Sequence, residues 1–142
     1  MRLRSCHNFH DFRELARRRL PRPIFDYIDG GADDEVTLRR NTESFGRCDL
    51  VPNVLRRVGA VDTSVTIMGQ ELAVPFYCFP TALQRLFHYD GERAVAAAAA
   101  KYRTMFGVSS FGTVSLEELR KKCTTPQIYQ FYFIKIGALT TR

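Results

Sequence analysis

Cysteine is scarce in this 142-residue sequence, and the cysteines that are present stand far apart. No C-x-x-C pair occurs among Cys6, Cys48, Cys78 and Cys123. This spacing argues against a disulfide framework and against a structural zinc site, so the thiols are expected to be reduced. Cys6 stands close to His7 and His10 near the N-terminus, where we interpret these side chains as solvated, so no metal site is predicted.

Long apolar runs are also missing. The longest, Ala94 to Ala100, is far shorter than the roughly 18 residues that a membrane span needs. Met1 to Ser5 carries charge but no apolar segment follows it, so no secretory signal is expected and the chain is predicted to be cytoplasmic. A G-x-G-x-x-G turn and a Walker-type lysine loop are absent, which argues against nucleotide binding through a glycine-rich turn.

Charge of one sign is only modestly in excess. The net charge of +6 comes from 21 basic and 15 acidic residues spread along the chain. Basic and aromatic residues do not alternate on one predicted element, so no nucleic-acid partner is predicted.

The first half of the sequence has the pattern of short helices. Pro21 ends one helix that includes Phe12 to Leu20, and Pro23 opens a second over Ile24 to Ile28. Acidic residues from Asp33 onward predict the start of a third helix that runs to about Phe45. A small hairpin is expected around Met68-Gly69-Gln70, with its strands at Val65 to Ile67 and Leu72 to Val74.

The second half alternates apolar runs with helical segments. The predicted strands are Val74 to Phe79, Thr104 to Ser109 and Ile128 to Ile134, and the predicted helices are Gly91 to Tyr102 and Ser115 to Cys123. Ser115 is a predicted N-cap, with Glu118 as its capping-box partner. This order predicts an α/β fold with a βαβαβ succession in a buried parallel sheet. Three strands are the front part of a larger fold, since a (β/α)8 barrel takes roughly 250 residues.

Polar residues lie at the carboxyl ends of the first two predicted strands and within the third, and parallel sheets place their functional groups at these ends. These residues are Pro80-Thr81-Ala82, Ser109-Ser110-Phe111, and Gln130 with Tyr132. Hydroxyls, an amide and a phenol at one edge suit a polar heteroaromatic ligand. The alternative is that the Ser and Thr residues simply cap the helices that follow.

Several motifs in this order resemble the FMN-dependent 2-hydroxy-acid dehydrogenases and oxidases, and the bacterial L-lactate dehydrogenases most of all. The likeness runs from about Phe12 to Lys135. The matching stretches are Asp26 to Glu35, Thr37 to Asn41, Pro80 to Ala82, His88 to Glu92, Ser109-Ser110 and Gln130 to Tyr132.

The resemblance implies a partial (β/α)8 TIM barrel that binds FMN at the carboxyl ends of its strands. By motif match, the backbone amide of Ala82, which follows Pro80 and Thr81, faces the hydride-accepting flavin N5. Thr81 and Ser109 then bond the flavin ring, and Gln130 its N3 and O4 edge. For the substrate, the resemblance assigns the carboxylate to Tyr27, the hydroxyl or carbonyl oxygen to Tyr132, and the side chain to Phe111. Fixed donors of this kind stabilise the negative charge of a reduced flavin.

The resemblance also divides the chain into three parts. Residues 1–73 form a helical lead-in with a hairpin, residues 74–135 the first βαβαβ of the barrel, and residues 136–142 an aberrant tail. The family pattern breaks at Ile136, and the family's histidine base, carboxylate-binding arginine and phosphate loops come later in its sequence. We therefore expect a truncated and inactive enzyme of L-2-hydroxy acids such as L-lactate, with oxygen, quinone or cytochrome as electron acceptor. The alternative is a non-enzymatic fragment or basic interaction module. Full-length relatives are expected to be homo-oligomers, in the cytoplasm or peripheral at the inner face of the bacterial membrane.

Overall fold

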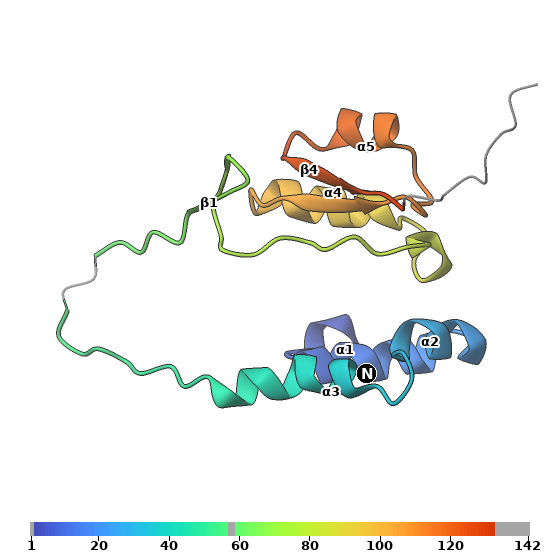
Figure 1. Ribbon diagram of the computed structural model, residues 1–142, viewed down its shortest axis with the longest axis horizontal. Helices are drawn as coiled ribbons and strands as arrows, with labels where there is room; N and C mark the ends of the chain where they lie inside the picture. The colour runs from blue at the N-terminus through green and yellow to red at the C-terminus, as the bar shows by residue number, and fades with distance from the viewer. Residues whose placement is uncertain (1, 57–58, 133–142) are drawn as a thin grey trace, which may run out of the picture. The chain divides into compact units, whose positions relative to one another are not determined.

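The computed structural model describes residues 2–56 and 59–132 and divides the chain into two units, Met1–Gly59 and Ala60–Arg142. The first unit contains three α-helices within its described residues (Figure 1). They are α1 (Phe9–Arg19), α2 (Arg22–Asp29) and α3 (Val36–Glu43), with short 3-10 helices at Leu3–Ser5 and Ser44–Arg47. No helix in the described ranges combines the length and the apolar character of a membrane span.

The first two helices agree with the sequence patterns. The side chain of Asn8 caps α1 by accepting a hydrogen bond from the backbone N–H of Asp11 at 2.9 Å. The helix ends before Pro21, and α2 has a proline in its first turn, where a missing N–H costs nothing. The Arg13 guanidinium binds the Asp29 carboxylate, with 2.8 Å between Nη2 and Oδ2, and so links the two helices.

The predicted start of the third helix at Asp33 is wrong. Asp33 and Glu35 have positive φ angles of 48° and 57°, which are turn conformations, and α3 begins at Val36. The Glu35 side chain accepts a hydrogen bond from the backbone N–H of Gly31 at 3.0 Å. This carboxylate therefore stabilises the turn before α3 rather than the first turn of the helix.

The second unit contains two small sheets within residues 60–132, the part of it that the structure describes. Strands β1 (Val65–Ile67) and β2 (Gln70–Leu72) form the predicted hairpin, and the second strand begins two residues earlier than expected. Strands β3 (Phe106–Ser109) and β4 (Gln127–Gln130) pair in parallel, as the βαβ pattern predicts. Helix α4 (Glu92–Lys101) precedes β3, and α5 (Leu116–Lys122) connects β3 to β4. The predicted third strand, Ile128 to Ile134, is too long, because β4 ends at Gln130 and residues 131 and 132 are not in a strand. Residues 133 and 134 lie outside the described residues.

The predicted strand at Val74–Phe79 is reduced to one bridge. Cys78 pairs in parallel with Phe106, through hydrogen bonds from Cys78 N–H to Met105 and from Gly107 N–H to Cys78. Pro75 has no N–H to donate to a ladder. The carbonyl of Phe76 is bound by the hydroxyl of Thr104 rather than by a backbone N–H. The segment is extended along β3 without forming a regular strand, and the described residues contain no closed barrel.

The core of the second unit lies between β3 and the two helices. Figure 1 shows both helices beside the β3–β4 sheet. The cluster consists of Ala96, Ala99, Phe106, Val108, Val114, Leu119 and Cys123. Ser115 caps α5 by accepting a hydrogen bond from Glu118 N–H at 3.3 Å, as predicted. The Glu118 carboxylate binds Arg93 on α4 instead of completing a capping box, so the charge links two helices.

A close approach on β3 gives the first prediction. A Cβ atom on Gly107 would lie 2.5 Å from Cδ and 2.8 Å from N of Pro80, so the Pro80 backbone would have to move. Gly107→Ala is expected to lower the free energy of unfolding by about 2 kcal/mol through overpacking. Gly46→Ala is the control, since no atom lies within 4 Å of its Cβ position. Urea unfolding followed by circular dichroism compares the two, and equal effects would contradict the prediction.

The buried carboxylate of Glu92 gives the second testable prediction. Glu92 is fully buried at the first position of α4 and accepts hydrogen bonds from the Thr113 hydroxyl at 2.6 Å and backbone N–H at 2.7 Å. Burial acts to raise the pKa of Glu92. Hydrogen bonds from Thr113 and from the backbone N–H groups of Glu92 and Gln84 outweigh burial and hold that pKa below its ordinary value of 4.5.

A depressed pKa in the folded state stabilises the fold above the unfolded pKa, and this stabilisation is lost as pH falls through the folded pKa. Glu92→Gln is therefore expected to cost about 2 kcal/mol at pH 7. The difference from the unmodified chain should shrink as pH falls below 4.5, the ordinary value. Urea unfolding between pH 3 and 7 measures the difference, with the exposed Glu71→Gln as control. A difference that does not change with pH would show that Glu92 is uncharged in the fold.

Candidate functional site

The carboxyl ends of β3 and β4 bring two predicted site residues together. Ser109 is opposite Gln130 in the register of the parallel pair. The Ser109 hydroxyl donates to Oε1 of Gln130 at 3.4 Å and accepts from the backbone N–H of Phe111 at 3.2 Å. A further hydrogen bond, from Ser110 N–H to the Gln130 carbonyl at 3.0 Å, fixes the chain beyond the strand ends. A hydroxyl and an amide therefore meet at one edge of the sheet.

Two aromatic rings lie beside these polar groups. The ring centroids of Phe111 and Tyr132 are 5.5 Å apart, with 45° between the ring planes. Their exposed fractions are 57% and 55%, so both rings offer a large apolar surface to a ligand. The sequence assigned both residues to substrate contact, and the structure places them in contact with each other.

The segment Pro80-Thr81-Ala82 is held next to this edge by its neighbours. The backbone N–H of Leu83 donates to the carbonyl of Phe111 at 3.0 Å. The side-chain amide of Gln84 donates to the carbonyl of Thr81 at 3.3 Å. Thr81 is exposed, and Pro80 and Ala82 are half-buried. The predicted cofactor contacts from two different loops therefore lie within one hydrogen-bonded assembly.

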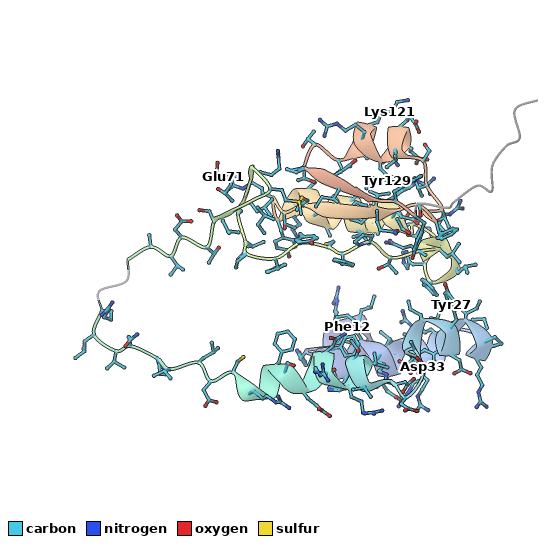
Figure 2. The ribbon with its side chains drawn as sticks, in the orientation of Figure 1. Phe12, Tyr27, Asp33, Glu71, Lys121 and Tyr129 are labelled. Atoms are coloured by element: carbon cyan, nitrogen blue, oxygen red, sulfur yellow. The ribbon has the colours of Figure 1, made fainter. Side chains whose placement is uncertain are left out.

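Tyr27, the third predicted substrate residue, lies in the other unit. It stands on α2, where its side chain is 62% exposed (Figure 2). Figure 2 also labels Tyr129, which is on β4 and next to Gln130 in the sequence. The phenol of Tyr27 is accessible within its own unit, as a ligand contact requires.

The remaining reactive groups near the sheet have structural roles. Burial raises the pKa of the Cys78 thiol, so this side chain stays protonated at neutral pH and is a poor nucleophile. Nδ1 of His88 accepts a hydrogen bond from the backbone N–H of Asp90 at 3.3 Å, which holds a turn. In the described ranges no three His, Cys, Asp or Glu side chains gather as metal ligands would.

The donor set fits the flavin ring that the resemblance implies. An isoalloxazine has a flat apolar face and an edge that alternates carbonyl oxygens with ring nitrogens. Gln130 offers a primary amide to such an edge, with its Oε1 bound by the Ser109 hydroxyl, and Phe111 and Tyr132 offer apolar ring surface. These groups carry no charge of their own that would repel an anionic reduced ring.

Sequence reasoning missed Glu92 and Thr113 as part of this assembly. Their hydrogen bonds join the first residue of α4 to the loop after β3. The sequence offered one signal, the position of Glu92 inside the motif His88 to Glu92, but no local pattern pairs it with Thr113.

Most of this chain is similar to known proteins. A family model described as FMN-dependent dehydrogenase matches residues 16–142. The peroxisomal (S)-2-hydroxy-acid oxidase GLO4 of Oryza sativa subsp. indica is 37% identical over 128 residues, which is 90% of this chain and 35% of the relative. Glycolate oxidase 1 of Zea mays is 36% identical with the same coverage of both chains.

Solved structures of 2-hydroxy-acid oxidases and dehydrogenases are also similar to this chain. A crystal structure of mandelate oxidase with 3,3-difluoro-2-hydroxy-3-phenylpropionic acid is similar to this chain with a TM-score of 0.80 and 35% identity. The similarity covers 89% of this chain and 38% of that one. A mutant of the active chimera of (S)-mandelate dehydrogenase has a TM-score of 0.79 and 32% identity, over 88% of this chain and 35% of that one. The chain thus spans just over a third of the length of these relatives, and it belongs to the FMN-dependent dehydrogenase family, whose cofactor is FMN.

Proposed function

We propose that this chain forms part of the flavin and substrate site of an enzyme that oxidises an L-2-hydroxy acid to the 2-oxo acid. The observation that carries the proposal is the hydrogen-bonded pair Ser109 and Gln130 at adjacent strand ends, with the Phe111 and Tyr132 rings beside it. When bound, FMN supplies an acceptor for hydride at N5. Family membership supports this reaction class, since relatives carry the names of 2-hydroxy-acid oxidases.

On the cofactor side, the proposed contacts are Pro80, Thr81, Ala82, Ser109 and Gln130. We assign the backbone N–H groups of Thr81 and Ala82 to the flavin. The side-chain amide of Gln130 supplies N–H donors from the sheet, and the Ser109 hydroxyl holds that amide by donating to its Oε1. Donors held in place before the reaction stabilise a charge that develops on the ring at no cost in reorganisation. The buried position of Ser109 and its bond to Phe111 N–H support this role.

On the substrate side, we assign the carboxylate to Tyr27, the reacting oxygen to Tyr132 and the substrate side chain to Phe111. A phenol O–H is a neutral donor that suits a carboxylate or a carbonyl oxygen. L-lactate is the acid that we propose, because its methyl group is small enough to pack against one exposed ring. The general base is not among these residues, and His88 is occupied by the Asp90 backbone.

For the whole protein we propose a homo-oligomer in the cytoplasm, with peripheral association at the inner face of the cell membrane as its membrane-bound form. The net charge of +6 favours such contact with anionic headgroups.

A binding experiment tests the cofactor assignment. The 142-residue chain contains part of the proposed site, so we expect it to bind FMN weakly, without stoichiometric yellow cofactor after gel filtration. Gln130→Ala is expected to weaken binding about tenfold, because one or two hydrogen bonds worth ~1 kcal/mol each are lost. Quenching of FMN fluorescence measures the dissociation constant. Gln70→Ala, on the exposed part of β2, is the control. Equal affinity of the Gln130 variant and the control would refute the assignment.

An activity experiment tests the substrate assignment. The chain is extended with the remaining residues of maize glycolate oxidase 1, and flavin reduction is followed at rising concentrations of L-lactate, glycolate and mandelate. We expect reduction by 2-hydroxy acids, with the highest kcat/KM for L-lactate. Tyr27→Phe should raise KM about tenfold, because a hydrogen bond to the carboxylate is lost. Tyr89→Phe, at an exposed ring, is the control. An unchanged KM in the Tyr27 variant would remove that residue from the site.

A further inference from the structure

Two loops meet at the carboxyl end of the β3 segment. The first loop, residues 79–91, follows Cys78 and contains the proposed flavin contacts Thr81 and Ala82. The second loop, residues 110–115, follows β3 and contains Phe111. They are joined directly by the hydrogen bond from Leu83 N–H to the carbonyl of Phe111 at 3.0 Å. The first loop contains the 3-10 helix Gln84–Leu86, and side chains add further contacts between the two loops.

Thr113 supplies a second connection. Its hydroxyl oxygen accepts from the backbone N–H of Arg85 in the first loop at 3.3 Å. The same hydroxyl donates to Oε2 of Glu92 at 2.6 Å, and the Thr113 N–H donates to Oε1 at 2.7 Å. An ionised carboxylate has no proton to give, so the Thr113 hydroxyl must donate to it and keep its lone pairs for Arg85. The charge on Glu92 therefore fixes the direction of the whole chain of bonds.

Gly91 allows the carboxylate to reach this position. Its φ angle is 49°, and a Cβ atom there would lie 2.6 Å from Cγ and 3.0 Å from N of Arg85. The first turn of α4 is thereby packed directly against the first loop. Glu92, the first residue of that helix, comes between the two loops with an exposed fraction of 0%.

Burying a carboxylate destabilises the fold more than burying an apolar side chain of the same size. Taking the charge out of water costs several kcal/mol unless hydrogen bonds replace the water, and an apolar side chain of similar volume often gives equal stability. The two bonds from Thr113 offset that cost, and a helix N-terminus favours negative charge. What a carboxylate adds over an apolar group is a fixed, directional arrangement of its partners.

We propose that Glu92 is a positioning residue of the flavin site, acting through Thr113 to hold loop 79–91 and loop 110–115 in one relative geometry. The inference rests on the proposed function for the identity of the ligand. Neither Glu92 nor Thr113 is assigned a contact with flavin or substrate. They act on the positions of Ala82 and Phe111 by joining the loops that contain these two residues.

Amide hydrogen exchange and FMN binding, measured on the full 142-residue chain, test this role. Thr113→Val removes the hydroxyl but keeps the shape of the side chain and the backbone N–H. We expect exchange at the amides of Leu83 and Arg85 to become at least tenfold faster, while exchange at Val108 in β3 stays within twofold. The FMN dissociation constant should rise about tenfold. Thr113→Ser, which restores the hydroxyl, should return both measurements to within twofold of the unmodified chain.

Thr66→Val on the hairpin strand β1 is the matched control and should change neither measurement. Faster exchange at Val108 together with the loop amides would mean that Thr113 supports the whole unit, and the positioning role would be overturned. Unchanged loop exchange in Thr113→Val, or faster loop exchange with unchanged FMN affinity, would overturn it as well. Absence of FMN quenching by the unmodified chain is a different failure. That result would refute the proposed function, whereas loop exchange would still report whether Thr113 joins the two loops.

Discussion

The burial of β3 on both of its faces is the constraint on which the second unit depends. On one face, Phe106 and Val108 pack against the alanines of α4 and Leu119 of α5. On the other, Pro80 approaches Gly107 so closely that no side chain fits between them. A strand enclosed in this way has no exposed face for ligand chemistry. Its carboxyl end, where the enclosing layers stop, is the place left for polar groups to meet.

The register of the β3–β4 pair follows from that burial and determines the site. A slip by one residue would move Phe106 and Val108 away from the helices, so the apolar side chains select a single pairing. In that pairing Ser109 is opposite Gln130, and a bond of 3.4 Å joins their side chains. The site geometry is in this sense a consequence of hydrophobic packing. The polar residues need no strong interaction of their own to be brought together.

Sequence patterns located most helices and the hairpin but not every boundary, and the reasons are specific. Pro21 and Pro23 are local signals, and the helices that they delimit are present. The Val74–Phe79 run has the composition of a strand, but Pro75 cannot donate to a ladder and Thr104, distant in sequence, binds the carbonyl of Phe76. The acidic residues before α3 favour a helix start by charge. Their positive φ angles belong to a turn that charge alone does not reveal.

Some residues of the candidate site could be predicted from local sequence patterns, and others depend on contacts between residues distant in sequence. Ser109 ends one predicted apolar run and Gln130 lies within the next, so position alone placed both on strands of the sheet, and the resemblance to the family gave them roles. Glu92 and Thr113 stand 21 residues apart, and their pairing depends on how two loops fold over a helix N-terminus. No periodicity encodes such a contact.

A negative charge beside a ring that becomes anionic on reduction would oppose the proposed chemistry if it were uncompensated. At Glu92 the first turn of α4 and the hydrogen bonds of Thr113 take up that charge, so the carboxylate can order the loops without placing free charge at the flavin. The donors proposed to face the ring are all neutral, and the one fully buried carboxylate among the described residues is enclosed by N–H and O–H groups. The Glu92 carboxylate can therefore hold the loops in place without opposing the negative charge on the reduced flavin, because its own charge is buried and hydrogen-bonded at the start of α4.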